Sequence, residues 1–164
     1  MECRLKSSGA WVVIAGLLSI LGCRVSGSIT HLIPDGYVGP VVIVFDDSKG
    51  EAPKRDENGG VIYEIPPDGV LRLSTPAPEV GFYNISYFYV RPDGARREIP
   101  KRVDKAVLQV FAVVDGATNG EREKRPPARW TWSAYIVGVP SNRDDWVQVR
   151  GEATSRAIGI PGLL

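Results

Sequence analysis

The feature that most restricts the fold of this chain is the spacing of its turns. Three Pro-Asp-Gly tripeptides, at 34–36, 67–69 and 92–94, separate short apolar runs. Proline presets φ and glycine takes a positive φ at little cost, so each tripeptide ends one run and turns the chain. Runs this short have the length of strands, since most helices are longer. The turn spacing therefore predicts an all-β domain.

The strands that we expect follow one another after residue 28. They lie at 29–33, 41–45, 61–65, 70–74, 82–91, 96–99, 107–114, 129–139 and 146–149. The first is expected at a sheet edge, and 82–91 and 96–99 are expected to form a hairpin. The run 41–45 is apolar on both faces, which predicts a central strand or one covered on both sides. No segment beyond residue 22 has a convincing helical period over ten residues.

These patterns predict a single antiparallel β-sandwich of about 7–9 strands. A small barrel is the alternative architecture. The expected domain spans residues 29–150, and 151–164 are expected to form an irregular C-terminal tail, because Gly159, Pro161 and Gly162 disfavour regular structure there.

The first 22 residues have the pattern of an export signal. Arg4 and Lys6 precede an uncharged apolar run at 10–21, and Gly22 and Cys23 follow. A basic start, an apolar run of about a dozen residues and a small residue at the cut are typical of a secretory signal. A membrane-spanning helix needs about 20 apolar residues, so this run is short for that purpose.

The end of the apolar run, Ile20-Leu21-Gly22-Cys23, resembles a bacterial lipobox. The resemblance implies cleavage between Gly22 and Cys23 and a diacylglycerol on the Cys23 thiol. The domain organisation is then a lipoprotein signal at 1–22 and a lipidated cysteine with a short tether at 23–28. A plain secretory signal and an uncleaved anchor are the alternatives. In two-membrane bacteria, an aspartate directly after the lipidated cysteine favours retention at the inner membrane. Here Arg24 occupies that position, so we expect the outer membrane if the host has one.

The charge balance excludes one large class of partners. After residue 22 the chain carries 18 Lys and Arg against 18 Asp and Glu. A general nucleic-acid binder needs a basic surplus to neutralise phosphates, so no nucleic-acid partner is expected. The two cysteines, Cys3 and Cys23, both precede the domain. The domain therefore has no thiol for a disulfide, a metal or a nucleophile.

Two segments of the domain are similar to a known family. They are Ile33 to Gly39, Ile-Pro-Asp-Gly-Tyr-Val-Gly, and Tyr63 to Leu71, with the apolar run 41–45 and Gly59-Gly60 between them. This order resembles an uncharacterised domain of bacterial exported proteins and lipoproteins, in which an Ile-Pro-x-Gly-Tyr-x-Gly segment precedes the apolar strand. Pro40 departs from the family's pattern. The resemblance implies an exported β-domain and no particular activity.

Aromatic side chains are the strongest candidates for a binding site. Trp130 and Trp132 share one strand face, as do Tyr87 and Tyr89. Such rings form a stacking platform for a sugar or peptide when exposed, and part of the core when buried. The core is the more favoured of the two interpretations. Exposure of the tryptophans would distinguish them.

Catalytic, metal-binding and cofactor-binding residues are not predicted. His31 is the only histidine, and the pairs Asp46-Asp47 and Asp144-Asp145 lack the spacing of a calcium loop. No P-loop, dinucleotide or hydrolase motif is present. We expect a non-enzymatic, lipid-anchored structural or interaction module whose partners are the membrane and an envelope protein or glycan. A small-ligand or carbohydrate-binding lipoprotein is the alternative, and an envelope enzyme that uses carboxylates alone is a third hypothesis.

Overall fold

The computed structural model describes residues 27–79, 83–101, 107–119, 129–140 and 143–159. Within these ranges the chain forms nine strands and one helix. The strands are β1 (Gly27–Pro34), β2 (Gly39–Phe45), β3 (Lys54–Arg55), β4 (Val61–Glu64), β5 (Val70–Arg72), β6 (Tyr83–Val90), β7 (Arg96–Glu98), β8 (Gln109–Asn119) and β9 (Arg129–Gly138). The helix is α1 (Arg143–Ile158).

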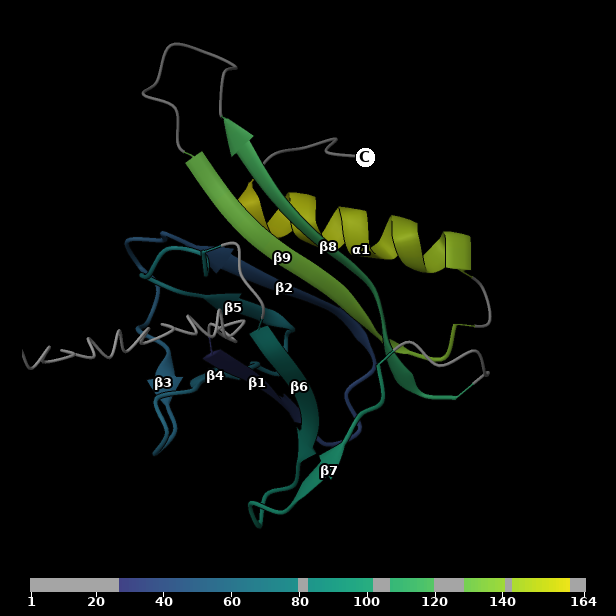
Figure 1. Ribbon diagram of the computed structural model, residues 1–164. Coiled ribbons are helices and arrows are strands. Elements are labelled where there is room, and N and C mark those ends of the chain that lie inside the picture. The colour runs from purple at the N-terminus through teal and green to yellow at the C-terminus, as the bar shows by residue number, and fades with distance from the viewer. Residues whose placement is uncertain (1–26, 80–82, 102–106, 120–128, 141–142, 160–164) are drawn as a thin grey trace, which may run out of the picture.

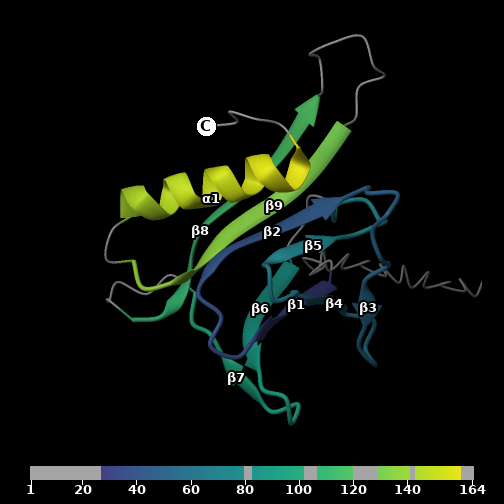
Figure 2. The same cartoon turned by 180° about the vertical axis from the view of Figure 1, so that it is seen from behind.

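The strands form two sheets that pack face to face. Sheet A has the order β3-β4-β1-β6-β7, and sheet B has the order β5-β2-β9-β8. Helix α1 lies across the face of sheet B that points away from sheet A (Figures 1 and 2). The predicted β-sandwich is confirmed. The sheets are mixed rather than antiparallel, because β1 runs parallel to β4 and β6, and β2 runs parallel to β5.

The parallel pairs arise from two turns that carry the chain from sheet A to sheet B. The first joins β1 to β2 and contains Gly36, with φ 76°; the second joins β4 to β5 and contains Gly69, with φ 78°. A turn that returned the chain to the same sheet would give an antiparallel hairpin. The third Pro-Asp-Gly turn does so between β6 and β7, which confirms the predicted hairpin.

The two sheet-crossing turns contact each other directly. The Tyr37 hydroxyl donates a hydrogen bond to the carbonyl of Pro40 and lies over Gly69, where a Cβ would be 2.1 Å from that hydroxyl. The Val42 amide donates to the Gly69 carbonyl at 2.9 Å. The two segments that carry the family resemblance therefore form one clasp between the sheets, and glycine is required at Gly69 by both space and φ.

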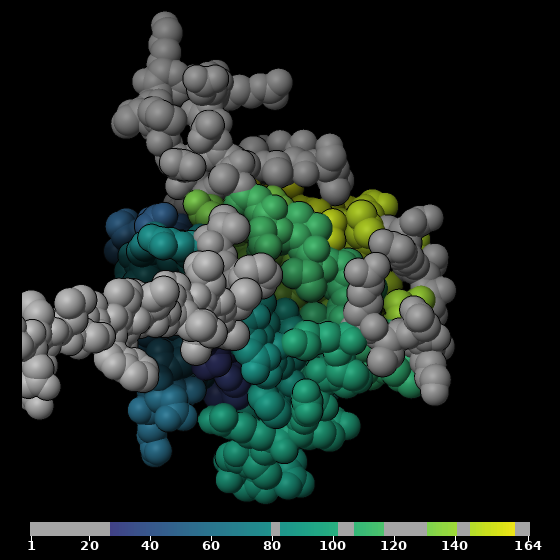
Figure 3. Space-filling model, in the orientation of Figure 1, coloured from purple at the N-terminus to yellow at the C-terminus, as the bar shows by residue number. Residues whose placement is uncertain are grey.

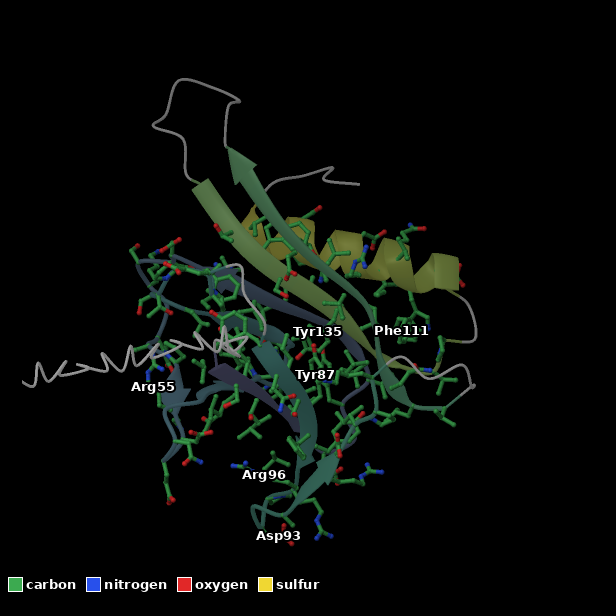
Figure 4. All side chains as sticks on the ribbon, viewed as in Figure 1. Arg55, Tyr87, Asp93, Arg96, Phe111 and Tyr135 are labelled. Carbon is green, nitrogen blue, oxygen red and sulfur yellow. The ribbon has the colours of Figure 1, made fainter. Side chains whose placement is uncertain are left out.

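The main core lies between the two sheets and is rich in rings. Tyr87 from sheet A and Tyr135 from sheet B meet with ring centroids 5.1 Å apart (Figure 4). Ile33, Ile43 and Val41 are fully buried beside them. The alternating pattern of β1 and β6 places Ile33 and Tyr87 on the inner face, as their period-two sequences predict.

A second, smaller core lies between sheet B and α1. Its members are Val42, Val44 and Ala134 from the sheet with Ala157 and Ile158 from the helix. The run 41–45 is thus central and covered on both sides, as predicted. The cover was not predicted: α1 occupies residues for which we expected a short strand at 146–149 and an irregular tail from 151.

The prediction for the first strand was wrong in position. β1 lies in the middle of sheet A, between β4 and β6, and not at an edge. It begins at Gly27, so Gly27 and Ser28 belong to the strand and not to the tether. Its polar residue His31 finds a hydrogen-bond partner inside the core, so the strand can lie between two neighbours.

Candidate functional site

A hollow of the described surface lies where three parallel strands end. β4, β1 and β6 run side by side in the same direction, so their carboxyl ends meet at one end of sheet A. The hollow there has a volume of about 430 Å³. Its lining includes Leu32, Pro34, Glu64, Ile65, Val90 and Pro92. We call it the strand-end hollow.

Charged side chains surround the strand-end hollow, and the described ones are paired. Asp35 accepts a hydrogen bond from Arg97 at 3.4 Å, and Glu64 accepts one from Lys54 at 2.7 Å. The guanidinium of Arg91 lies 3.6 Å from the Asp93 carboxylate. Exposed pairs of this kind contribute little stability, on the order of 0–1 kcal/mol each. Because these opposite charges are paired, the surface around the strand-end hollow is nearly neutral, and the lining of the hollow is mainly apolar.

The prolines at the ends of the three strands mark this site, which was not predicted from the sequence. Pro34, Pro66 and Pro92 each come at or just after the end of a strand. Proline has no amide hydrogen and ends a ladder, so the same residue type follows each of three strands. The repetition was visible in the sequence. Its meaning depended on the parallel arrangement, which places the three strand ends together.

The predicted aromatic platform is not supported by its tyrosines. Tyr87 and Tyr89 are 4% and 1% exposed and belong to the core between the sheets, so they cannot stack on an external ligand. Trp132 is half-buried on the outer face of sheet B, beside Gly116 of β8 and against the smaller core under α1. The side chain of Trp130 lies outside the described residues. Trp132 and the two tyrosines lie on different faces of different sheets, so the structure does not bring these three rings together.

His31 is part of the main core. Its Nδ1 lies 3.0 Å from the Tyr135 hydroxyl, and the rings of Tyr63, Tyr87 and Tyr135 surround it. Burial, with a smaller contribution from the positive charge of Lys101, lowers the pKa of His31 to about 3. The imidazole is therefore neutral at physiological pH. Because the ring is buried and neutral, we interpret His31 as a structural residue of the core.

The acidic pairs do not form a cation site in the described residues. Asp47 is buried and accepts hydrogen bonds from the Lys49 amide at 2.9 Å and from Arg72 at 2.7 Å. These bonds lower the pKa of Asp47 below its usual value, the amide of Lys49 contributing most. Arg72 also donates to the Ala157 carbonyl at the end of α1. The second pair lies on α1, and the described part of the chain holds no cluster of ligands that suits a metal.

The predicted lipidation and cleavage residues, Cys23 and Gly22, lie outside the described residues. Only three residues separate Cys23 from Gly27, where β1 begins. In the described part of the chain, no helix combines the length and apolar character needed to cross a bilayer.

Comparisons with known proteins relate the domain to a family and to a solved structure, but they assign no activity to it. Residues 27–129 match the model of a family of unknown function, DUF6843. The crystal structure of a "Putative Lipoprotein from Bacillus anthracis" has a similar fold, with a TM-score of 0.50 and 19% sequence identity over 67% of this chain and 68% of that chain. Similarity at this level concerns the fold alone. No curated protein matches the sequence.

Proposed function

This chain belongs to the family of unknown function DUF6843, and we propose from its own residues that it is a lipid-anchored interaction module of the cell envelope. Cys23 carries the lipid, and the strand-end hollow binds a partner. The location is the outer membrane if the host has one. The single observation that carries the proposal is that β1 begins four positions after Cys23 in the sequence and ends at the strand-end hollow.

The tether supports a position close to the membrane. Gly27 is four positions after Cys23, so the two Cα atoms can be at most about 14 Å apart along an extended chain. Two or three acyl chains on one cysteine hold a protein on a membrane firmly, at about 0.8 kcal/mol per buried CH₂ group. The start of β1 is therefore held near the lipid headgroups.

The direction of β1 supports a binding role for its other end. β1 has eight residues and spans about 26 Å. β4 and β6 run parallel to it, so the strand-end hollow lies a full strand length from the tethered end. Apolar side chains line this hollow, and the nearby charges already have partners. These features favour an apolar segment of an envelope protein as the partner, in preference to a charged ligand or a glycan.

We propose that the module acts by binding and not by catalysis. The only histidine is buried, and the carboxylate of Asp47 is occupied by Arg72. Acid–base chemistry needs a titratable group within reach of substrate. The described lining of the strand-end hollow offers only the exposed carboxylates of Asp35 and Glu64 for that purpose, and each is paired.

The anchor is tested by metabolic labelling with radioactive palmitate. We expect the full chain to be labelled and to sediment with membranes, and Cys23→Ser to lose the label. Cys3→Ser is the matched control and should be labelled like the wild type. Labelling that persists in Cys23→Ser, or is absent in the wild type, would overturn the anchor.

The binding role is tested by site-specific photo-crosslinking in intact cells. Glu64 and Asn84 are both exposed and lie on the outward-facing side of sheet A, near opposite ends of it. A photoreactive residue at position 64 should give a discrete adduct with an envelope protein, whereas one at 84 should not. The adduct at 64 should also disappear on Leu32→Asp. Equal adducts at both positions, or no adduct at 64, would contradict binding at the strand-end hollow.

A further inference from the structure

The outer edge of β8 changes character along its length. β8 is the last strand of sheet B, so one of its edges has no neighbour within the sheet. The chain covers the first part of this edge itself. The Val110 amide donates to the Pro100 carbonyl at 2.9 Å, and Lys101 forms an isolated parallel β-bridge with Val110. In the described residues, no strand pairs with the outer edge of 113–119.

A β-bulge separates the two parts of the edge. The register with β9 shifts between Phe111 and Val114, and Ala112 has φ 52°. Arg150 of α1 donates a hydrogen bond to the Ala112 carbonyl, which holds the kink in place. Val113 lies in the bulge and Val114 directly follows it, and they are 51% and 37% exposed. The helix thus supports a conformation that presents apolar side chains beside an open strand edge.

Beyond the bulge, the open part of the edge has little of the usual protection against pairing. Native edge strands are kept apart by charged side chains, above all lysine, by proline, by bulges or by very short length. Residues 113–119, Val-Val-Asp-Gly-Ala-Thr-Asn, contain neither lysine nor proline, and β8 is the longest strand described. Its surface forms a continuous strip on the face shown in Figure 3. An edge of this kind offers unpaired main-chain donors and acceptors to another extended chain.

The end of β8 also extends beyond its own sheet. The pairing of β2 with β9 stops at Phe45 and Thr131, whereas β8 and β9 continue to pair as far as Asn119 and Arg129. The last rows are a two-stranded ribbon that projects from the body (Figures 1 and 2). Isolated two-stranded ribbons are marginally stable in water, and a third strand stabilises them.

We propose that residues 113–119 of β8 pair with the same segment of a second copy of this chain, antiparallel and about a two-fold axis. The pairing joins two copies of sheet B into one continuous sheet. A strand edge is self-complementary in the antiparallel sense, and two-fold dimers are the commonest closed assemblies. The small residues Gly116 and Ala117 lie at the middle of the segment, and Asp115 is its only charged residue.

The opposite edge of sheet B explains why association stops at two copies. On β5, the Glu51 amide donates to the Arg72 carbonyl, and the Ser74 amide donates to the Glu51 carbonyl, each at 3.0 Å. The Val70 amide donates to the Asp68 carboxylate at 3.0 Å. The chain thus covers much of that edge with its own residues, so it offers a second copy little to pair with.

Sedimentation equilibrium of the full chain in non-ionic detergent tests this pairing, over about 1 to 100 µM because dimer formation follows mass action. We expect a concentration-dependent dimer whose dissociation constant rises roughly tenfold in Val113→Lys, because lysine is added to both edges. Val38→Lys is the matched control: Val38 is 53% exposed, lies in the turn before β2, and should leave the dimer unchanged.

Hydrogen exchange supplies a second readout that does not depend on a substitution. Amides in 113–119 should gain protection as the protein concentration rises, while amides of the covered strand β1 should not change. A monomer at every concentration overturns the proposal. Equal dimerisation of Val113→Lys and Val38→Lys, or concentration-independent exchange at 113–119, overturns it as well, since the copies would then meet elsewhere or merely share a micelle.

Discussion

The two faces of sheet B bury side chains of different kinds against different partners. The inner face packs Val41, Ile43 and Tyr135 against the strands of sheet A. The outer face packs Val42 and Val44 against one helix. The inner face includes buried rings and a buried polar contact between Tyr135 and His31, whereas the buried members of the outer cluster are aliphatic and its one ring, Trp132, is only half-buried.

This difference shows which face determines the structure. On the inner side, two sheets held by hydrogen-bonded ladders and by the Tyr37–Gly69 clasp leave the side chains no room to rearrange. On the outer side, α1 contacts the sheet through one stripe, which includes Ala153, Ala157 and Ile158. A single helix can move toward a smaller side chain more easily than a whole sheet can. We therefore expect the inner face to be the less tolerant of substitution.

The largest expected effect is at the centre of the inner face. Tyr135 is fully buried, so Tyr135→Ala should lower the free energy of unfolding by about 3–5 kcal/mol, as for other large aromatic truncations. Tyr135→Phe keeps the ring and removes only the hydroxyl that contacts His31, so it should cost about 1–2 kcal/mol. Urea denaturation followed by tryptophan fluorescence measures both. Equal losses would mean that the hydroxyl, and not the ring, dominates at this position.

The next effect is a loss of stability in acid that originates at the inner face. The pKa of His31 is lowered to about 3 in the folded chain, against 6.5 when unfolded, so the unfolded state binds the proton more readily. The contribution of neutral His31 to the free energy of unfolding is fully present above pH 6.5, the unfolded pKa. It decreases as the pH drops from 6.5 toward 3, by about 1.4 kcal/mol per pH unit. Between pH 7 and pH 4.5 the loss is therefore roughly 2–3 kcal/mol.

His31→Gln isolates this contribution, because glutamine does not titrate and can still bond to the Tyr135 hydroxyl. The variant is expected to be less stable at pH 7 but to depend less on pH between 6.5 and 4.5, as measured by urea denaturation at several pH values. The carboxylates, Asp47 included, are common to both proteins and cancel in the difference. Parallel pH curves for the two proteins would show that His31 is not the source.

The smallest effect compares the two faces on one strand. Val41 and Val42 are adjacent in β2, both are fully buried, and they point to the inner and the outer face respectively. Removing the same atoms should cost about 2–3 kcal/mol in Val41→Ala and about 1–2 kcal/mol in Val42→Ala. Thermal and urea unfolding of the two variants measure the difference. Similar losses would mean that α1 is held as rigidly as sheet A.

Local sequence patterns predicted most of the strands but not how they pair. The turns at Pro34-Asp35-Gly36 and Pro92-Asp93-Gly94 have the same chemistry. The first carries the chain to the other sheet, and the second makes a hairpin within sheet A. Turn residues determine a change of direction, while the choice of sheet depends on which apolar faces must meet. The parallel neighbours of β1, and with them the strand-end hollow, therefore could not be deduced from the turns.

The helix was not predicted because the apolar residues of α1 do not all lie on its buried side. Val147 and Val149 of α1 are exposed, whereas Thr154 is buried and Arg150 is half-buried against the bulge of β8. A helix is recognised in a sequence by a continuous apolar stripe, and this one buries a threonine among the alanines that face the sheet while it exposes two valines. The better signal was β2, whose apolar residues on both faces required a cover. The sequence thus indicated the need for α1 more clearly than its location.

The position of β1 determines how the domain would respond to force. β1 is the strand next to Cys23, and it is held on both sides, by four register pairs with β4 and eight with β6. Tension transmitted through a lipid anchor would act along this strand and load both ladders in shear, so that the hydrogen bonds on its two sides would have to break together. A strand at the sheet edge would instead be peeled away one bond at a time. An anchor at Cys23 would therefore load a strand that resists such tension better than an edge strand would.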